Sequence, residues 1–294
     1  MDIVPSIRQA AIGNYSVFYR EAGPPDAPVV LLLHGFPSSS HQYRYLIPIL
    51  ATVYHVIAPD FPGFGFTTTP SDFPHTFANI ADVIEGLLDH LCIKKFAVYI
   101  FDYGAPTGFR LALRRPDAVT AIISQNGNAY DEGLGAFWDP IKQYWSTGSQ
   151  EDRDAIRNLL TFDVTKLQYT LGAKDANALA PEAWWLDWSL MNTNPGNGDY
   201  QLDLFYDYRT NVAQYPQYQE YLRNSQVPLL AIWGKSDIIF VPEGATAFKR
   251  DLPNSEIHLI DAGHFALESN LDEVAGHILP FLKTVHQAGK MKDF

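Results

Sequence analysis

The sequence predicts an α/β fold in which a mostly parallel central sheet lies between helices and has an inserted helical cap. Short apolar runs recur along the chain, and each ends in Gly, Asp, Asn or Pro, as buried strands do. Amphipathic stretches separate several of these runs, which is typical of parallel strands joined by right-handed crossovers. Between about residues 128 and 226, aromatic-rich helical segments replace the strand-like runs.

Six apolar runs rich in Val, Ile, Leu and aromatic residues are expected to form the parallel strands. In chain order they are APVVLLLHG, YHVIAPDF, KFAVYIFD, VTAIISQN, VPLLAIWG and SEIHLIDAG. An earlier strand pair, from about Ile7 to Glu21, is expected to add an antiparallel edge. The segments FANIADVIEGLLDHL and GFRLALRRPDAV have the apolar periodicity of helices that cover such a sheet.

The change of pattern predicts two units. Residues 1–127 and 227–294 form the core domain, and residues 128–226 form the helical cap domain inserted between two of its strands. Five of the six tryptophans fall in the cap: Trp138, Trp145, Trp184, Trp185 and Trp188. Packing of the cap against the core is the expected role for most of them, and Trp138 and Trp145 are also candidates for substrate binding.

Composition disfavours several partners. Acidic residues outnumber basic ones by 33 to 21, and the resulting net charge of -12 disfavours nucleic acid and anionic membrane surfaces. Neither a signal-peptide pattern nor a bilayer-length apolar run is visible, so we expect a cytoplasmic location. The single cysteine, Cys92, is expected to be a buried small hydrophobe, and the polar tail from His286 to Phe294 is expected to be disordered.

No metal or cofactor is implied. The nine histidines show no paired-ligand spacing, and His34 in HGFP is expected to shape a loop rather than bind metal. The segment with Gly63 and Gly65 lacks the third glycine of a nucleotide-binding loop. We also expect the peptide between Phe36 and Pro37 to be cis, which would turn the Phe36 N–H inward.

Candidate catalytic residues stand at strand ends, where parallel α/β sheets bind their ligands. His34 follows the first apolar run, Asp102 ends KFAVYIFD, Asp237 follows LLAIWGKS, and His264 follows IHLIDAG. A nucleophile at a sharp strand-to-helix turn, then an acid, then a histidine is the order of a hydrolase catalytic triad. The spacing therefore indicates nucleophilic catalysis.

These segments also carry a resemblance that covers nearly the whole chain. HGFP, DFPGFGFTTTP, FDYGAPTGFRLAL, WGKSD and DAGHFALE resemble, in order and spacing, the epoxide hydrolase and haloalkane dehalogenase branch of the α/β-hydrolase superfamily. The resemblance implies that Asp102 is the nucleophile, Asp237 the acid that orients the histidine, and His264 the base. It also implies that the backbone N–H groups of Phe36 and Tyr103 form the oxyanion hole.

A carboxylate nucleophile agrees with that assignment, because it is ionised at neutral pH and attacks carbon without first losing a proton. The attack would leave an ester on Asp102, which water activated by His264 would hydrolyse. Each residue also has a structural alternative. Asp102 could cap a helix, and Asp237 could belong to a plain turn. Some relatives have the acid one strand earlier, where this chain has Asn126.

Opening an epoxide also needs a proton donor for the departing alkoxide, and a neutral tyrosine hydroxyl suits this role. By resemblance, the two cap tyrosines of the family fall on Tyr144 in KQYW and Tyr208 in YDYRTN. Tyr206 is the fallback if the helix register differs. Because tyrosines are numerous in this segment, packing is the alternative role for each of them.

Departures from the family pattern bear on the leaving group. Ile100 and Phe101 stand where the family usually has a small residue and often a histidine. Dehalogenases typically follow the nucleophile with a tryptophan that holds the halide, whereas this chain has Tyr103, although Trp145 or Trp138 could supply a donor. We therefore expect an epoxide hydrolase for a small neutral hydrophobic substrate. A haloalkane-type dehalogenase and a non-hydrolytic or ligand-binding member of the fold are the alternatives.

Overall fold

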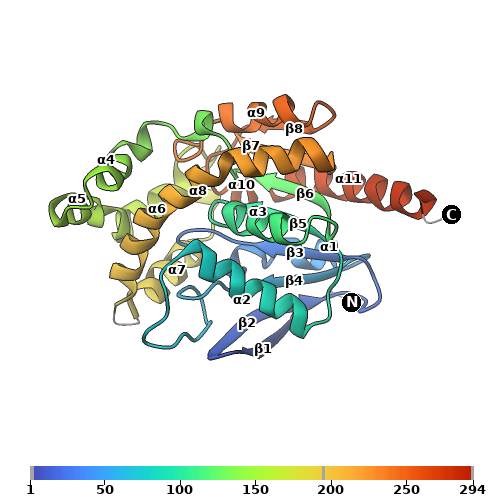
Figure 1. Cartoon of the computed structure of the whole chain (residues 1–294), viewed down its shortest axis with the longest axis horizontal. Coiled ribbons are helices and arrows are strands. Elements are labelled where there is room, and N and C mark those ends of the chain that lie inside the picture. The colour runs from blue at the N-terminus through green and yellow to red at the C-terminus, as the bar shows by residue number, and fades with distance from the viewer. Residues whose placement is uncertain (1–2, 194–195, 293–294) are drawn as a thin grey trace.

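A single mixed sheet organises the protein, as seen in a computed structural model that describes residues 3–193 and 196–292 (Figure 1). The strand order is β1-β2-β4-β3-β5-β6-β7-β8, with β1 and β2 antiparallel to their neighbours and the other pairs parallel. The strands are β1 (Ser6–Ile12), β2 (Tyr15–Ala22), β3 (Val29–Leu33), β4 (His55–Pro59), β5 (Phe96–Phe101), β6 (Val119–Gln125), β7 (Leu229–Gly234) and β8 (Glu256–Ile260). The predicted fold class, with six parallel strands and an antiparallel edge pair, is confirmed.

Helices cover both faces of this sheet. They are α1 (Leu46–Leu50), α2 (Phe77–His90), α3 (Gly104–Arg114), α9 (Glu243–Asp251), α10 (Ala266–Ser269) and α11 (Leu271–Lys292). Alternate side chains of the buried strand β5 enter different layers: Val98 packs with α2 and α3, whereas Tyr99 packs with α1 and α11. The continuous apolar strand runs are therefore explained by burial on both faces.

Five further helices occupy the chain between β6 and β7, where the sequence predicts the cap. They are α4 (Asp139–Thr147), α5 (Gln150–Ala155), α6 (Phe162–Thr170), α7 (Glu182–Thr193) and α8 (Asn197–Ser225). In Figure 1, α4 and α5 lie beyond one end of the sheet, and the long helix α8 runs back over α2 and α3, which it contacts. Within the two described stretches, no helix is both long enough and apolar enough to cross a lipid bilayer.

Two local predictions are wrong. Cys92 is exposed, because it adopts a left-handed conformation, with φ of 57°, where the chain leaves α2, and the neighbouring Ile93 is buried instead. The tail is not disordered from His286, because α11 continues to Lys292 and the His286 ring packs against Tyr54. Residues 293–294 lie outside the described residues.

Ile100, near the end of β5, is a bulky residue at a position where the family pattern has a small one, and the packing of α3 leaves room for it. A Cβ atom on Gly108 would lie 2.6 Å from Cγ2 of Ile100, so the missing side chain on the helix leaves room for Ile100 on the strand. Gly104 allows a second close approach, because a Cβ there would lie 2.2 Å from the carbonyl oxygen of Leu33. The helix therefore packs tightly on the strand that precedes Asp102.

This packing predicts that the effect of Gly108→Ala on stability depends on Ile100. In the wild-type protein the new methyl group collides with Ile100, and we expect a loss of about 1–3 kcal/mol. In an Ile100→Ala background the collision disappears, and the better helix propensity of alanine should make the same change neutral or stabilising by up to about 1 kcal/mol. Urea unfolding of the four proteins measures this, and an equal loss in both backgrounds would contradict the packing account.

Candidate active site

The carboxyl ends of β5, β7 and β8 bring the three predicted catalytic side chains together. Asp102 follows β5, Asp237 lies in the loop after β7, and His264 lies in the loop after β8. His264 Nδ1 lies 2.8 Å from Asp237 Oδ2, and His264 Nε2 lies 3.8 Å from Asp102 Oδ2. All three residues are at most 4% exposed. The arrangement has the connectivity of a carboxylate–histidine–carboxylate triad.

Asp102 occupies a strained turn that aims its carboxylate. Its φ of 48° is uncommon for a residue with a side chain. Its Oδ1 accepts hydrogen bonds from the backbone N–H groups of Phe36 and Tyr103, each at 2.6 Å. The loop approaches closely because a Cβ on Gly35 would lie 2.3 Å from this oxygen. With Oδ1 held, Oδ2 is the oxygen that faces His264. The Phe36–Pro37 peptide is cis, as predicted.

Asp237 is fixed on both of its oxygens. Its Oδ1 accepts from the backbone N–H of Ile239 at 2.7 Å, and its Oδ2 accepts from Asn126 Nδ2 at 2.6 Å as well as facing His264 Nδ1. Asn126 is itself held, because its Oδ1 accepts from the backbone N–H of Gly234 at 3.2 Å. From sequence, Asn126 was only a position without an acid. Its polar side chain at the end of β6 was the available signal for its place beside Asp237.

Burial and charge set the proton affinities of the site. Burial raises the pKa of Asp102 to about 6, although nearby His264 and the hydrogen bonds from Phe36 and Tyr103 oppose this rise. Burial by itself would lower the pKa of His264, but the charge and hydrogen bond of Asp237 outweigh it, and the pKa of His264 is raised. A carboxylate that accepts from Nδ1 leaves Nε2 of a neutral imidazole as the basic nitrogen.

The second ring nitrogen of His264, Nε2, faces the Asp102 side of the site. It is buried and has no hydrogen-bond partner among the described residues. A cavity of about 20 Å³ borders His264 and Asp237, and Leu167, Leu171 and Ile238 also line it. This volume is enough for about one water. The cavity therefore has room for about one water beside the pair formed by Asp237 and His264.

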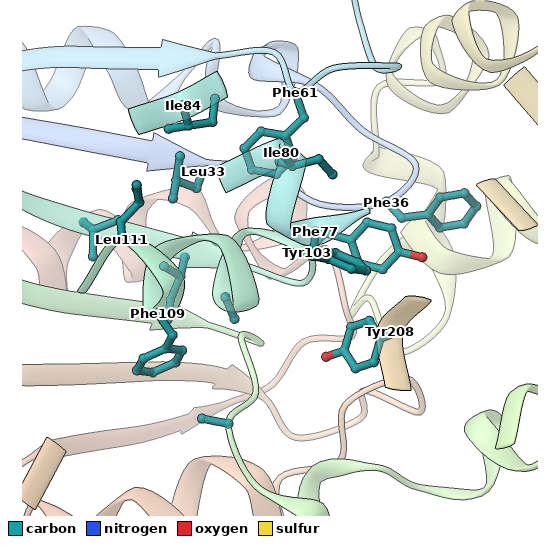
Figure 2. Packing of buried hydrophobic residues seen from close by; sticks show 14 of the residues in the cluster. Leu33, Phe36, Phe61, Phe77, Ile80, Ile84, Tyr103, Phe109, Leu111 and Tyr208 are labelled. Carbon is teal, nitrogen blue, oxygen red and sulfur yellow. The ribbon is translucent and has the colours of Figure 1, made fainter. Parts of the chain in front are cut away.

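Aromatic side chains surround the residue after Asp102 (Figure 2). The ring of Tyr103 lies 4.8 Å from Phe77, 5.9 Å from Tyr208 and 6.0 Å from Phe36, between ring centroids. The Tyr103 hydroxyl is buried and has no partner within the described part of the chain. The surroundings of Asp102 thus combine apolar walls with a few hydroxyl groups, which suits a neutral hydrophobic ligand.

The two predicted proton donors differ in position. Tyr208, on α8, is fully buried beside Tyr103. The Tyr144 hydroxyl accepts a hydrogen bond from Arg153 at 3.2 Å, and its ring packs on Tyr206. These contacts of Tyr144 are with other residues of the predicted cap. The structure therefore brings Tyr208, rather than Tyr144, into contact with the aromatic group around Asp102.

The two tryptophans proposed for substrate binding line this region but have their N–H groups occupied. Trp138 lies 4.4 Å from the Tyr208 ring, and its Nε1 donates to the carbonyl of Ile239 at 2.7 Å. Trp145 stacks on Tyr208, and its Nε1 donates to the carbonyl of Phe205 at 2.6 Å. Both indoles offer apolar faces, and neither has a free N–H for a halide.

His34 has a structural position in the loop before the cis peptide. Its Nε2 accepts from the backbone N–H of Phe61 at 2.9 Å, and its Nδ1 lies 3.0 Å from the Gly35 carbonyl. Complete burial lowers its pKa to about 3, so it is neutral. Within residues 3–193 and 196–292, no group of three or more His, Cys, Asp or Glu side chains could hold a metal ion.

Comparisons with known proteins identify the family. A family model described as the alpha/beta hydrolase fold matches residues 28–271. An uncharacterized hydrolase of Saccharomyces cerevisiae is 46% identical over 268 residues, which is 90% of this chain and 92% of that protein. A haloalkane dehalogenase of Bradyrhizobium diazoefficiens is 39% identical over 116 residues, which is 40% of this chain and 37% of that protein. The protein therefore belongs to the α/β-hydrolase family.

A solved structure described as the epoxide hydrolase CorEH without ligand shares this fold. Its TM-score is 0.77 at 22% sequence identity, and the match covers 96% of this chain and 99% of that one. At this identity the likeness concerns the fold. The catalytic chemistry has to be argued from the site.

The raised pKa predicts that Asp102 reduces stability at neutral pH. A carboxyl group whose pKa is 3.8 when unfolded and about 6 when folded disfavours the folded state once it ionises, by up to about 3 kcal/mol. Asp102→Asn removes this charge, and asparagine tolerates the left-handed conformation. We expect the variant to melt several degrees above the wild-type protein at pH 8, and close to it at pH 4, in circular dichroism. An equal difference at both pH values would refute this linkage.

Proposed function

We propose that the protein hydrolyses epoxides through a covalent ester on Asp102. The observation that carries the proposal is the asymmetry of this carboxylate. Two backbone N–H groups hold Oδ1 at 2.6 Å, while Oδ2 faces His264 Nε2 at 3.8 Å in a buried aromatic site. This asymmetry supports attack by Oδ2 and a later role for Oδ1 as the oxygen on which negative charge develops. The haloalkane dehalogenase among the relatives supports the same kind of first step.

In the first step, Oδ2 of Asp102 attacks an epoxide carbon. A C–O bond forms to the carboxylate, the epoxide C–O bond breaks, and its electron pair moves to the epoxide oxygen. That oxygen takes the hydroxyl proton of Tyr208, so the intermediate is a hydroxyalkyl ester with a tyrosinate beside it. Attack requires the ionised form of Asp102.

In the second step, His264 Nε2 removes a proton from water, and the hydroxide adds to the ester carbonyl carbon. The carbonyl oxygen, which was Oδ1, becomes an oxyanion between the N–H groups of Phe36 and Tyr103. Collapse expels the diol oxygen, which takes the proton from the imidazolium. The regenerated carboxylic acid ionises and returns a proton to Tyr208, which completes the balance of one epoxide and one water to one diol.

The hydrogen-bond donors available to a leaving group favour an epoxide over a halide as the substrate. An alkoxide needs a proton, and the buried Tyr208 hydroxyl can supply one. A halide needs N–H donors, whereas Trp138 and Trp145 donate to backbone carbonyls and Tyr103 stands where dehalogenases typically have tryptophan. We infer a small, neutral, hydrophobic substrate, enclosed by the cap at residues 128–226 and processed without a cofactor. Haloalkane dehalogenation is the second candidate, because the relative from Bradyrhizobium diazoefficiens matches over 116 residues.

The proposal predicts that His264→Gln accumulates the ester. Without the base, attack by Asp102 proceeds but hydrolysis stops, so incubation with small aryl and alkyl epoxides should add the whole mass of the epoxide to the protein. Intact-protein and peptide mass spectrometry should locate the adduct on Asp102. The matched control, His264→Gln with Asp102→Asn, should remain unmodified.

Three results would contradict this outcome: no adduct with any epoxide of the panel, an adduct on another residue, or turnover that survives Asp102→Asn. The same panel should include haloalkanes. An alkyl adduct together with free halide, and no diol from epoxides in the wild-type protein, would establish dehalogenation instead.

A further inference from the structure

We propose that Tyr215 and Asn128 are positioning residues that direct the hydroxyl proton of Tyr208 towards the substrate. The inference rests on the proposed function and concerns how its proton donor is prepared. Tyr208 Oη lies 3.3 Å from Oη of Tyr215, which is about two turns further along the same face of α8. Tyr215 Oη lies 3.2 Å from Nδ2 of Asn128, in the loop after β6. All three side chains are at most 1% exposed, so bulk water does not compete for these groups.

The orientation of the Asn128 amide is determined by its own loop. Its Nδ2 donates to the carbonyl of Tyr130 at 2.7 Å, and its Oδ1 accepts from the backbone N–H of Tyr130 at 3.2 Å. If the amide were flipped, its oxygen would face the Tyr130 carbonyl and its NH2 group would face the Tyr130 N–H, so neither hydrogen bond could form. The second Nδ2 hydrogen therefore points at Tyr215, and the Tyr215 oxygen must accept it.

This fixed amide is the reason for the direction that we assign to the hydrogen bonds from Asn128 through Tyr215 to Tyr208. Either hydroxyl can donate in the contact between Tyr208 and Tyr215. Since the Tyr215 oxygen already accepts from Asn128, the proposed arrangement has Tyr215 donate its single proton to Tyr208. Tyr208 is then an acceptor in this contact, and its own proton has no other protein acceptor among the described residues. A proton left free in a buried site is available to a bound epoxide oxygen.

The surrounding backbone and a buried arginine keep these three hydrogen-bonded side chains in place. Cβ atoms on Gly133 and Gly244 would lie 2.2 and 2.7 Å from Oδ1 of Asn128, so the backbone at both positions packs closely against the amide. Arg110, on α3, donates to Asn211 Oδ1 at 2.5 Å and to Tyr218 Oη at 2.8 Å, both on α8. Since α3 begins just after Asp102, these bonds tie the helix that contains Tyr208 to the carboxylate that attacks.

The arrangement acts on one step of the reaction. When the epoxide C–O bond breaks, its oxygen takes the Tyr208 proton, and the resulting phenolate keeps a hydrogen bond from Tyr215, which keeps one from Asn128. The 3.3 Å contact is long for a hydroxyl pair, and charge on Tyr208 should shorten it. We call the hydrogen bonds from Asn128 through Tyr215 to Tyr208 the relay. Ester hydrolysis uses His264 and water, so the relay should leave that step unchanged.

The test is Tyr215→Phe, which keeps the ring and removes the hydroxyl. We expect ester formation, followed by rapid-quench mass spectrometry in single turnover, to slow about tenfold or more, within the range of acid catalysis. Hydrolysis of the ester should keep its wild-type rate. Epoxides whose oxygen leaves more easily, such as nitro-substituted styrene oxide, should lose less rate than the unsubstituted compound. The control is Tyr221→Phe on the same helix, whose buried hydroxyl has no partner among the described residues.

Each other outcome has a defined meaning. Equal slowing of both steps, or equal loss on activated and unactivated epoxides, would show that Tyr215 only supports the fold and would overturn the relay. Unchanged ester formation in Tyr215→Phe would overturn it too. If the wild-type protein forms no ester with any epoxide, the proposed function fails and the relay fails with it.

Discussion

The structure depends most on the pair of hydrogen bonds that hold one oxygen of Asp102. They require the left-handed turn after β5, a glycine at position 35, and a helix α3 that starts at once. They also keep a carboxylate in a place where burial raises its pKa to about 6. The carboxylate is thus destabilised relative to water but still ionised at neutral pH, which is the condition that the proposed nucleophile needs.

The remaining groups of the site are ordered around that oxygen by the sheet and by α8. The neighbouring strands β6 and β7 place Asn126 and Asp237 in contact, and Asp237 in turn orients His264. Helix α8 contributes Tyr208, whose ring lies 5.9 Å from that of Tyr103, and α8 is held to α3 by Arg110. In the proposed reaction, the core supplies nucleophile, base and oxyanion hole, and the cap supplies the proton and the apolar walls.

The sequence predicted those features of the protein that depend on local patterns of neighbouring residues. Apolar runs located the strands. Residues just after those runs included Asp102, Asp237 and His264, and they were candidates for the site because parallel strands bring their carboxyl ends to one edge. The cap was harder, since its helices are aromatic throughout. Tyr208 was the better match to the family pattern, but its contact with Tyr103 and the backbone partners of Trp138 and Trp145 could not be seen. Contacts between distant segments, such as Asn128 with Tyr215, have no local signature. Cys92 was misjudged because a helix end, not hydrophobicity, decides its exposure.

The central claim is that water attacks the carbonyl of an Asp102 ester rather than the substrate. A single turnover with enzyme in excess, carried out in ¹⁸O-labelled water, separates the two directly. The account predicts that the label enters the carboxylate of Asp102, as found in its peptide by mass spectrometry, while the first diol contains no ¹⁸O. Label in the first diol with none in Asp102 would show direct attack of water on the epoxide and would contradict the account.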